Sequence, residues 1–176
     1  MSELTTLHDA IEATLREQMP KVVHVEAFPD LENLFDLPAI YFALTDITLG
    51  EDRGEGKTGI KGLFQACILV DPERPRAPLQ AAILAAQLTA VLKDQYWGVE
   101  FIMTPPEDIR AQPDGSAPEL ARFVVWVVEW TQSFEVGEVQ WPFDDEPGPL
   151  VWGVSPDVGL GHEDDYFTAD SLEARL

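Results

Sequence analysis

The chain has 176 residues, 45% of them hydrophobic, and its 32 acidic against 11 basic side chains give a formal net charge of −21. This length supports one sizeable core, so we expect a single domain with an appended segment rather than two full domains. The negative charge repels phosphate backbones and anionic lipid surfaces, which argues against sequence-specific nucleic-acid binding and against a membrane partner.

The first part of the chain predicts a helix and two strands. Apolar residues recur at helical spacing after a capping Ser2, and Pro20 ends the helix. Residues 21–28 predict a short strand, and a loop with one helical turn follows from Pro29. Residues 39–49, AIYFALTDITL, predict a second strand that is apolar on both faces at first and alternates later.

A charged, glycine-rich stretch comes next. Residues 50–59, GEDRGEGKTG, hold four glycines and five charges, so we expect the polar tip of a β-hairpin whose second strand covers residues 60–70. The end of this stretch is similar to a phosphate-binding loop. Glu51 stands where such a loop needs glycine, and a strand follows instead of a helix, so we predict no nucleotide site.

Residues 78–95 predict a second helix, which a proline-rich turn at 71–78 introduces. The helix contains strong helix formers and no charge before Lys93. Its apolar stripe is wider than one sheet face would cover, because Leu84 and Leu88 lie beside the stripe that includes Leu79. Two interpretations follow: a core helix laid on a sheet, or a helix whose second face also contacts another subunit.

The remaining strands are predicted at 97–103 and 120–136, with a short edge strand at 109–111 and a turn at 113–115. One face of the long strand 120–136 is apolar nearly throughout and carries Trp126 and Trp130. The order of elements predicts an α+β fold, a mainly antiparallel sheet packed against two helices with an extended acidic C-terminal arm. We place the core domain at residues 1–137 and the arm at residues 138–176.

The last 42 residues, 135–176, hold eleven carboxylates and a single cation, Arg175, yet they also contain several aromatic side chains. Solvated tails contain few aromatic residues, so we expect this segment to lie along a protein surface. Its acidic clusters at 144–146 and 163–165 lack the ligand spacing of a calcium-binding loop. We therefore predict no bound metal and no cofactor.

No catalytic constellation stands out in the sequence. The three histidines, His8, His24 and His162, are not at metal-ligand spacing, and no nucleophile elbow is present. Cys67 lies in an apolar stretch that predicts a buried strand position. We predict that the protein is not an enzyme. The N-terminus has no basic start followed by an apolar run, so we also expect a soluble protein made in a cytoplasm.

The sequence resembles the tail terminator, or tail-completion, proteins of long-tailed bacteriophages, in particular those of Mu-like contractile phages and phage-derived tail particles. The resemblance rests on the order of elements and on three short stretches: LPAIY at 37–41, the Asp71-Pro72 turn before the second helix, and VSPDVG at 154–159. It implies a structural virion protein in a ring, commonly of six subunits. Such a ring caps the tail tube, stops its polymerisation and offers a surface to the neck.

The resemblance also implies partners and a location. The partners are other copies of the chain, tail tube and sheath proteins, and neck or head-tail connector proteins, in a particle assembled in the host cytoplasm. By position, we assign the charged loop to the lumen or the tube, through Glu51, Asp52, Arg53, Glu55 and Lys57. Residues expected at subunit or partner contacts are Trp126, Trp130, Leu84, Leu88, Trp141, Phe143, Val151 and Trp152.

Two other interpretations remain open at the level of sequence. One is a small acidic binding or inhibitor protein that mimics DNA, and the other is a different component of a head-tail connector. A DNA mimic would display carboxylates at phosphate-like spacing on a monomer, and the aromatic residues of the arm would then have no obvious use.

Overall fold

The computed structural model describes most of the first 138 residues and a few positions beyond them. The described residues are 2–28, 36–51, 53–54, 56–115, 120–138, 151–152, 161 and 167–168. The chain divides into two compact units, residues 1–140 and residues 141–176. In the second unit, β6 (Val151–Trp152) pairs antiparallel with β7 (Phe167–Thr168). The predicted helical turn after Pro29 lies outside the described residues.

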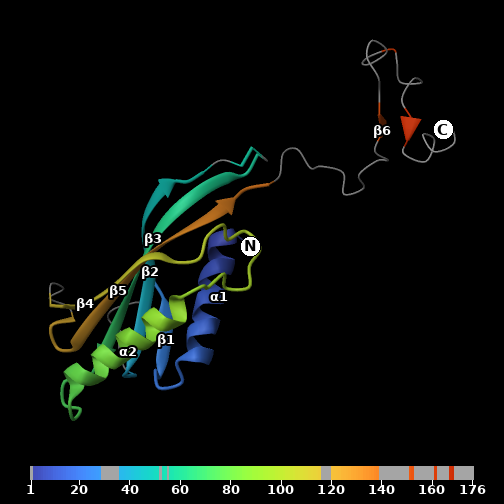
Figure 1. Ribbon diagram of the computed structural model, residues 1–176. Helices are drawn as coiled ribbons and strands as arrows, with labels where there is room; N and C mark the ends of the chain where they lie inside the picture. The colour runs from blue at the N-terminus through green and yellow to red at the C-terminus, as the bar shows by residue number, and fades with distance from the viewer. Residues whose placement is uncertain are drawn as a thin grey trace. The chain divides into compact units, whose positions relative to one another are not determined.

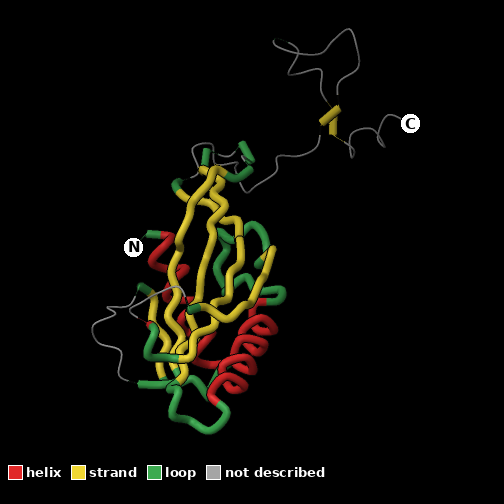
Figure 2. The backbone as a smooth tube through the Cα atoms, turned by 90° about the vertical axis from the view of Figure 1, so that its left-hand side faces the viewer, coloured by secondary structure: helices red, strands yellow, loops and turns green. Residues whose placement is uncertain are grey.

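The first unit is an α+β domain, which confirms the predicted fold class. Its elements in chain order are α1 (Glu3–Gln18), β1 (His24–Ala27), β2 (Ala39–Leu49), β3 (Thr58–Val70), α2 (Ala77–Leu92), β4 (Glu107–Asp114) and β5 (Val124–Val136). The strands form one sheet in the order β1-β2-β3-β5-β4, in which only β1 and β2 run parallel. Both helices lie on the same side of this sheet (Figure 1), and strands face the viewer from the other side in Figure 2.

Helix α1 forms where the sequence predicts it. The Ser2 hydroxyl accepts a hydrogen bond from the Thr5 amide at 3.3 Å, which caps the N-terminus. Leu7, Ile11 and Leu15 make one fully buried stripe, and each contributes about 1.5–3 kcal/mol by leaving water. Burial of this stripe against the sheet therefore fixes which side of α1 faces inward.

The main core lies between the helices and the even-numbered side of β3 and β5. These two strands pair without a register shift from Thr58 opposite Val136 to Val70 opposite Val124. Because side chains alternate along a strand, Phe64 and Trp130 point to the same side, where their rings stack 5.3 Å apart. Helix α2 packs on this side as well and buries Leu84 and Leu88.

A β-bulge changes the side of the sheet to which the side chains at the end of β2 point. Leu44 pairs with Phe64, but Asp46 pairs with Leu63, so one extra residue is inserted in β2. Beyond this bulge, Ile47 and Leu49 take the side of the sheet that faces the helices. Both remain exposed, because the sheet continues past its helical cover.

The predicted strand at 97–103 is wrong, because this segment consists of turns. Trp97 and Gly98 have φ values of 55° and 69°, which no regular strand contains. The segment meets the sheet through one isolated bridge, from Ile102 to Phe134. The Trp97 indole turns inward instead, where its N–H donates to the side-chain oxygen of Gln132 at 2.7 Å. Burial of the indole outweighs the β-propensity of the segment.

Strand β4 is longer than the predicted edge strand at 109–111, and the predicted turn at 113–115 is misplaced. Pro113 and Asp114 belong to β4 and pair with Trp126 and Val125 of β5. An edge strand tolerates proline because the missing N–H faces away from the ladder. The edge position of β4 therefore explains why the turn signal in the sequence was misleading.

Gln132 is the polar residue that holds the turn segment on the core. It is fully buried, and its amide nitrogen donates to the carbonyl oxygens of Gln95 and Thr104, both at 3.0 Å. With the bond from the buried Trp97, three polar groups depend on this single side chain, and the other two are part-buried.

We expect Gln132→Leu to lower the free energy of unfolding by about 2–4 kcal/mol, because it leaves buried polar groups without partners. Urea denaturation followed by circular dichroism measures this loss. Gln112 is exposed on β4, so Gln112→Leu is the matched control. Its free energy of unfolding should stay within about 0.5 kcal/mol of the wild-type value. Equal stability of the two variants would contradict the role given to Gln132.

Candidate functional site: two apolar surfaces and a charged loop

The structure places the predicted contact residues of the first unit in or against the core. Trp130, Leu84 and Leu88 are buried, and Trp126 is half-buried and packs against the same cluster. In the folded chain, the three buried side chains have almost no surface to offer a partner. The large apolar residues that α2 does expose are Leu79 and Ile83.

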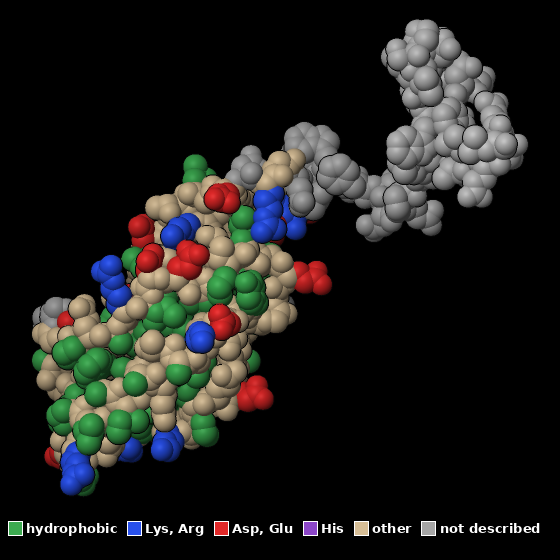
Figure 3. All heavy atoms as spheres, viewed as in Figure 1, with side chains coloured by type: hydrophobic (Ala, Val, Ile, Leu, Met, Phe, Trp, Pro, Cys, Tyr) green, Lys and Arg blue, Asp and Glu red, His purple; other side chains and the backbone are tan. Residues whose placement is uncertain are grey.

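The first exposed apolar surface, here called the base surface, lies at the start of α2. Leu79 and Ile83 are 52% and 45% exposed and stand four residues apart, so they are neighbours on one side of the helix. Beside them is a cavity of about 390 Å³. Its lining residues are Lys21, Pro38, Arg74, Gln80, Ile83 and Leu84. Figure 3 shows basic and hydrophobic side chains together at this end of the domain.

The second exposed surface, here called the tip surface, lies beside the start of α1. Ile47 and Leu49 are 51% and 83% exposed, and Phe28 is exposed as well. A cavity of about 440 Å³ runs between Phe28, Ile47 and residues of the first turns of α1. His8 is one of its lining residues, and the His8 ring stacks on Phe42 with the two planes only 10° apart.

The charged loop at residues 50–59 is closed at its neck by two glycines. The Gly50 amide donates to the Gly59 carbonyl oxygen at 2.9 Å. A Cβ atom on Gly59 would lie 1.9 Å from the carbonyl oxygen of Glu51, so no larger residue fits without moving the backbone. The glycines of this stretch therefore set a tight neck, in addition to the flexibility that the sequence predicts.

Glu135 anchors the cations of this loop to β5. Its carboxylate lies 3.7 Å from Arg53 and 3.9 Å from Lys57, and its backbone N–H donates to the Phe101 carbonyl oxygen at 2.9 Å. Glu135 is buried, whereas Arg53 is more than half exposed. Arg53 and Lys57, which are predicted to face a lumen or tube, are thus paired with a carboxylate of the same chain.

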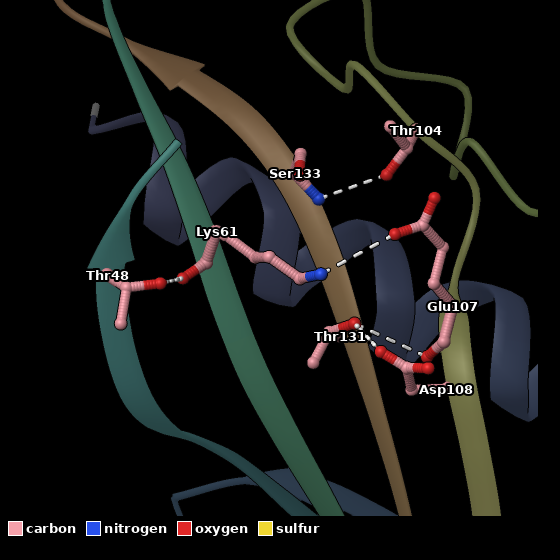
Figure 4. A network of polar contacts seen from close by, with 7 residues as sticks. All are labelled: Thr48, Lys61, Thr104, Glu107, Asp108, Thr131 and Ser133. Carbon is pink, nitrogen blue, oxygen red and sulfur yellow. Dashed lines mark hydrogen bonds and ion pairs between the residues drawn. The ribbon is translucent and has the colours of Figure 1, made fainter. Parts of the chain in front are cut away.

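A polar network covers the side of the sheet opposite the helices near the loop (Figure 4). Lys61 of β3 pairs with Glu107 of β4 at 3.6 Å, reaching across β5. The Thr131 hydroxyl donates to Asp108 at 3.4 Å, and the Ser133 amide donates to the Thr104 hydroxyl at 3.2 Å. These contacts tie the edge strand to the centre of the sheet, so they serve the fold.

Cys67 lies half-buried on β3, on the side of the sheet away from the helices. Burial raises the pKa of its thiol above the ordinary value, and the charge of Asp114 adds to this effect. A raised pKa lowers the fraction of reactive thiolate.

Among the described residues, no group of three or more His, Cys, Asp or Glu is arranged to hold a metal ion. None of their helices is long and apolar enough to cross a membrane.

The remaining predicted site residues lie wholly or partly outside the described residues. Trp141, Phe143, Asp52 and Glu55 are not among them, and of Val151 and Trp152 only the backbone in β6 is described. Glu51 is exposed at the neck of the loop.

Sequence reasoning missed both exposed surfaces. The bulge that redirects Ile47 and Leu49 leaves no mark in the alternation of residues, and the approach of Lys21 to Arg74 joins positions 53 apart in the chain. One signal for the base surface was available: helix α2 is too apolar to bury all its sides on one sheet.

The fold and these surfaces define an α+β domain with two separate exposed apolar surfaces. Among solved structures, the chain is similar to the PVC sheath/tube terminator of an extracellular contractile injection system in its extended state, with a TM-score of 0.43 and 16% sequence identity. The match covers 85% of this chain and 63% of that chain, so this chain spans less than two thirds of the terminator's length. No protein-family model and no curated protein matches the chain.

We expect Glu135→Gln to speed hydrogen exchange in peptides that cover residues 50–59 by about two- to fivefold, because ion pairs with exposed partners stabilise by less than about 1 kcal/mol. Exchange measured by mass spectrometry tests this. Glu100→Gln removes an exposed carboxylate outside the loop and should leave exchange there unchanged. Unchanged exchange in Glu135→Gln would show that the two ion pairs do not hold the loop.

Proposed function

We propose that this chain is the subunit of a tail-terminator ring, a hexamer that caps a tail tube, stops its polymerisation and joins it to a neck. The observation that carries the proposal is the presence of two different exposed apolar surfaces on one domain. A subunit in a ring contacts one neighbour on each side through different surfaces, and the two apolar surfaces offer one such contact each. The sequence resemblance to tail terminators supports the same function.

The positions of the surfaces suit this arrangement. Pro38 in the base surface and Ile47 in the tip surface are nine residues apart along β2, a separation of about 30 Å at roughly 3.3 Å per residue. One subunit can therefore meet two neighbours at once. The charged loop, anchored by Glu135, would face the lumen or the tube, where acidic walls discourage DNA from sticking.

The proposed partners are other copies of the chain, tail tube and sheath proteins, and a neck or connector protein. The proposed location is the tail or neck region of a virion or related particle, assembled in a host cytoplasm. We propose no catalysis. The acidic arm at 138–176 would act as a strap across a neighbouring subunit, because its aromatic residues need a surface to cover them.

We expect Ile83→Glu combined with Leu79→Glu to abolish the ring, because the exposed apolar row would become charged in an interface. Mass photometry and electron microscopy, on the protein alone and with tube ends, measure particles at six times the 19.6 kDa of one chain. Tyr96→Glu changes an exposed aromatic residue elsewhere and should leave the ring intact. A wild-type monomer that stays monomeric on tube ends would instead favour the DNA-mimic interpretation.

We expect deletion of residues 138–176 to weaken ring or neck assembly while the first unit stays folded, since the chain divides into compact units near this point. Circular dichroism reports the fold, and the same mass measurement reports assembly. A truncated chain that assembles as well as the wild type would refute the strap.

A further inference from the structure

The base surface holds two cations that have no carboxylate partner among the described residues. Among the lysines and arginines of the described residues, those paired with Asp or Glu are Arg16, Arg53, Lys57 and Lys61. Lys21 and Arg74, which line the base cavity, have no carboxylate partner among those residues. The guanidinium of Arg74 is held in place by a 2.8 Å hydrogen bond to the Leu37 carbonyl oxygen. In a chain of net charge −21, two such cations at one cavity mark a site for an anionic group.

The rest of the cavity is suited to an apolar group. Pro38, Ile83 and Leu84 contribute its apolar lining, and no acidic side chain is among its lining residues. The first turn of α2 adjoins the cavity and carries no acidic residue, and Arg76 provides no side-chain cap. The partial positive charge of a helix N-terminus favours carboxylates nearby. An occupant that combines an aromatic group with adjacent carboxylates therefore matches the cavity.

This chemistry is present in the chain itself. Residues 141–146 read Trp-Pro-Phe-Asp-Asp-Glu, two aromatic residues followed at once by three acidic ones. They stand near the start of the segment 135–176, which holds eleven carboxylates and one cation. The charge is thus complementary to Lys21 and Arg74, and the aromatic residues are complementary to the apolar lining.

The same chain cannot place Trp141 and Phe143 of this segment in its own cavity. The cavity residue Pro38 lies level with the start of β5. Pro38 precedes Ala39, which pairs with Leu69, and Leu69 pairs with Val125 of β5. From Val125 to Val136, β5 extends eleven residues, about 36 Å at roughly 3.3 Å per residue. Trp141 follows Val136 by five positions, a reach of at most about 18 Å, and Phe143 follows it by seven positions, about 25 Å. The two aromatic side chains at this cavity must therefore come from another molecule.

We propose that the base cavity binds residues 141–146 of a second copy of this chain, with the aromatic side chains against Pro38 and Ile83 and the acidic ones beside Lys21 and Arg74. The contact is head-to-tail, so repeating it closes a ring or builds a row. This contact rests on the proposed ring function, because the ring is what the contact would build. The contact itself can form without a tail tube.

The test uses two full-length variants, each defective on one side of the contact. The first is Lys21→Glu with Arg74→Glu, which reverses the cavity and leaves the arm intact. The second is Asp144→Lys with Asp145→Lys, which reverses the arm and leaves the cavity intact. Each alone should self-associate about tenfold or more weakly than the wild type in sedimentation velocity. Mixed at equal concentration, they should form a one-to-one dimer, because one intact cavity meets one intact arm.

Two controls make the result decisive. Lys93→Glu with Arg110→Glu makes the same change in charge at exposed cations of other elements and should keep wild-type association. Lys21→Gln with Arg74→Gln should weaken association less than the reversal does, and circular dichroism verifies that every variant folds.

Wild-type association in the cavity variant, or no dimer in the mixture, would overturn the contact. A wild-type chain that does not self-associate at any concentration would overturn it as well. The ring function fails separately: it is refuted if the wild type shows this pairing but never caps a tube. If capping occurs and the cavity variant caps normally, only the contact is wrong.

Discussion

The antiparallel ladder between β3 and β5 is the constraint on which the rest of this domain depends. Thirteen residues of each strand pair without a shift, so the side on which every side chain of both strands points follows from one register. That register places Phe64, Trp130 and Phe134 on the side that the two helices cover. The opposite side keeps a smaller cluster around Tyr41, and the polar network that fastens β4.

Toward the loop, the ladder is also longer than its helical cover (Figure 1), and this mismatch accounts for the tip surface. Toward the loop, the sheet continues past α1, and the bulge in β2 turns Ile47 and Leu49 to the uncovered stretch. At the other end, α2 buries Leu84 and Leu88 but leaves Leu79 and Ile83 in contact with solvent. The domain thus has exposed apolar residues at both ends, which suits assembly in a row or a ring.

The distribution of cations distinguishes these two ends. Near the loop, Arg53 and Lys57 are bound by Glu135 of the same chain, and Lys61 by Glu107. At the base, Lys21 and Arg74 have no such carboxylate among the described residues. Because only 11 basic side chains oppose 32 acidic ones, two cations at one cavity without a carboxylate partner are unusual in this chain. Electrostatic complementarity of this kind sets orientation and specificity more than affinity.

By itself, the sequence determined the helices, the hairpin and the α+β class, because periodicity and capping are local properties that a single segment carries. It placed β2 at its observed bounds and α1 and β3 within one or two residues. It failed at residues 97–103, where a buried hydrogen bond from Trp97 to Gln132 overrides strand propensity, and at β4, where an edge position tolerates Pro113. Which apolar residues are exposed, and which cations of the described residues lack a carboxylate partner, follows from the three-dimensional packing alone. Both depend on contacts between residues far apart in the chain, such as Lys21 with Arg74 around one cavity, and no local pattern encodes those distances.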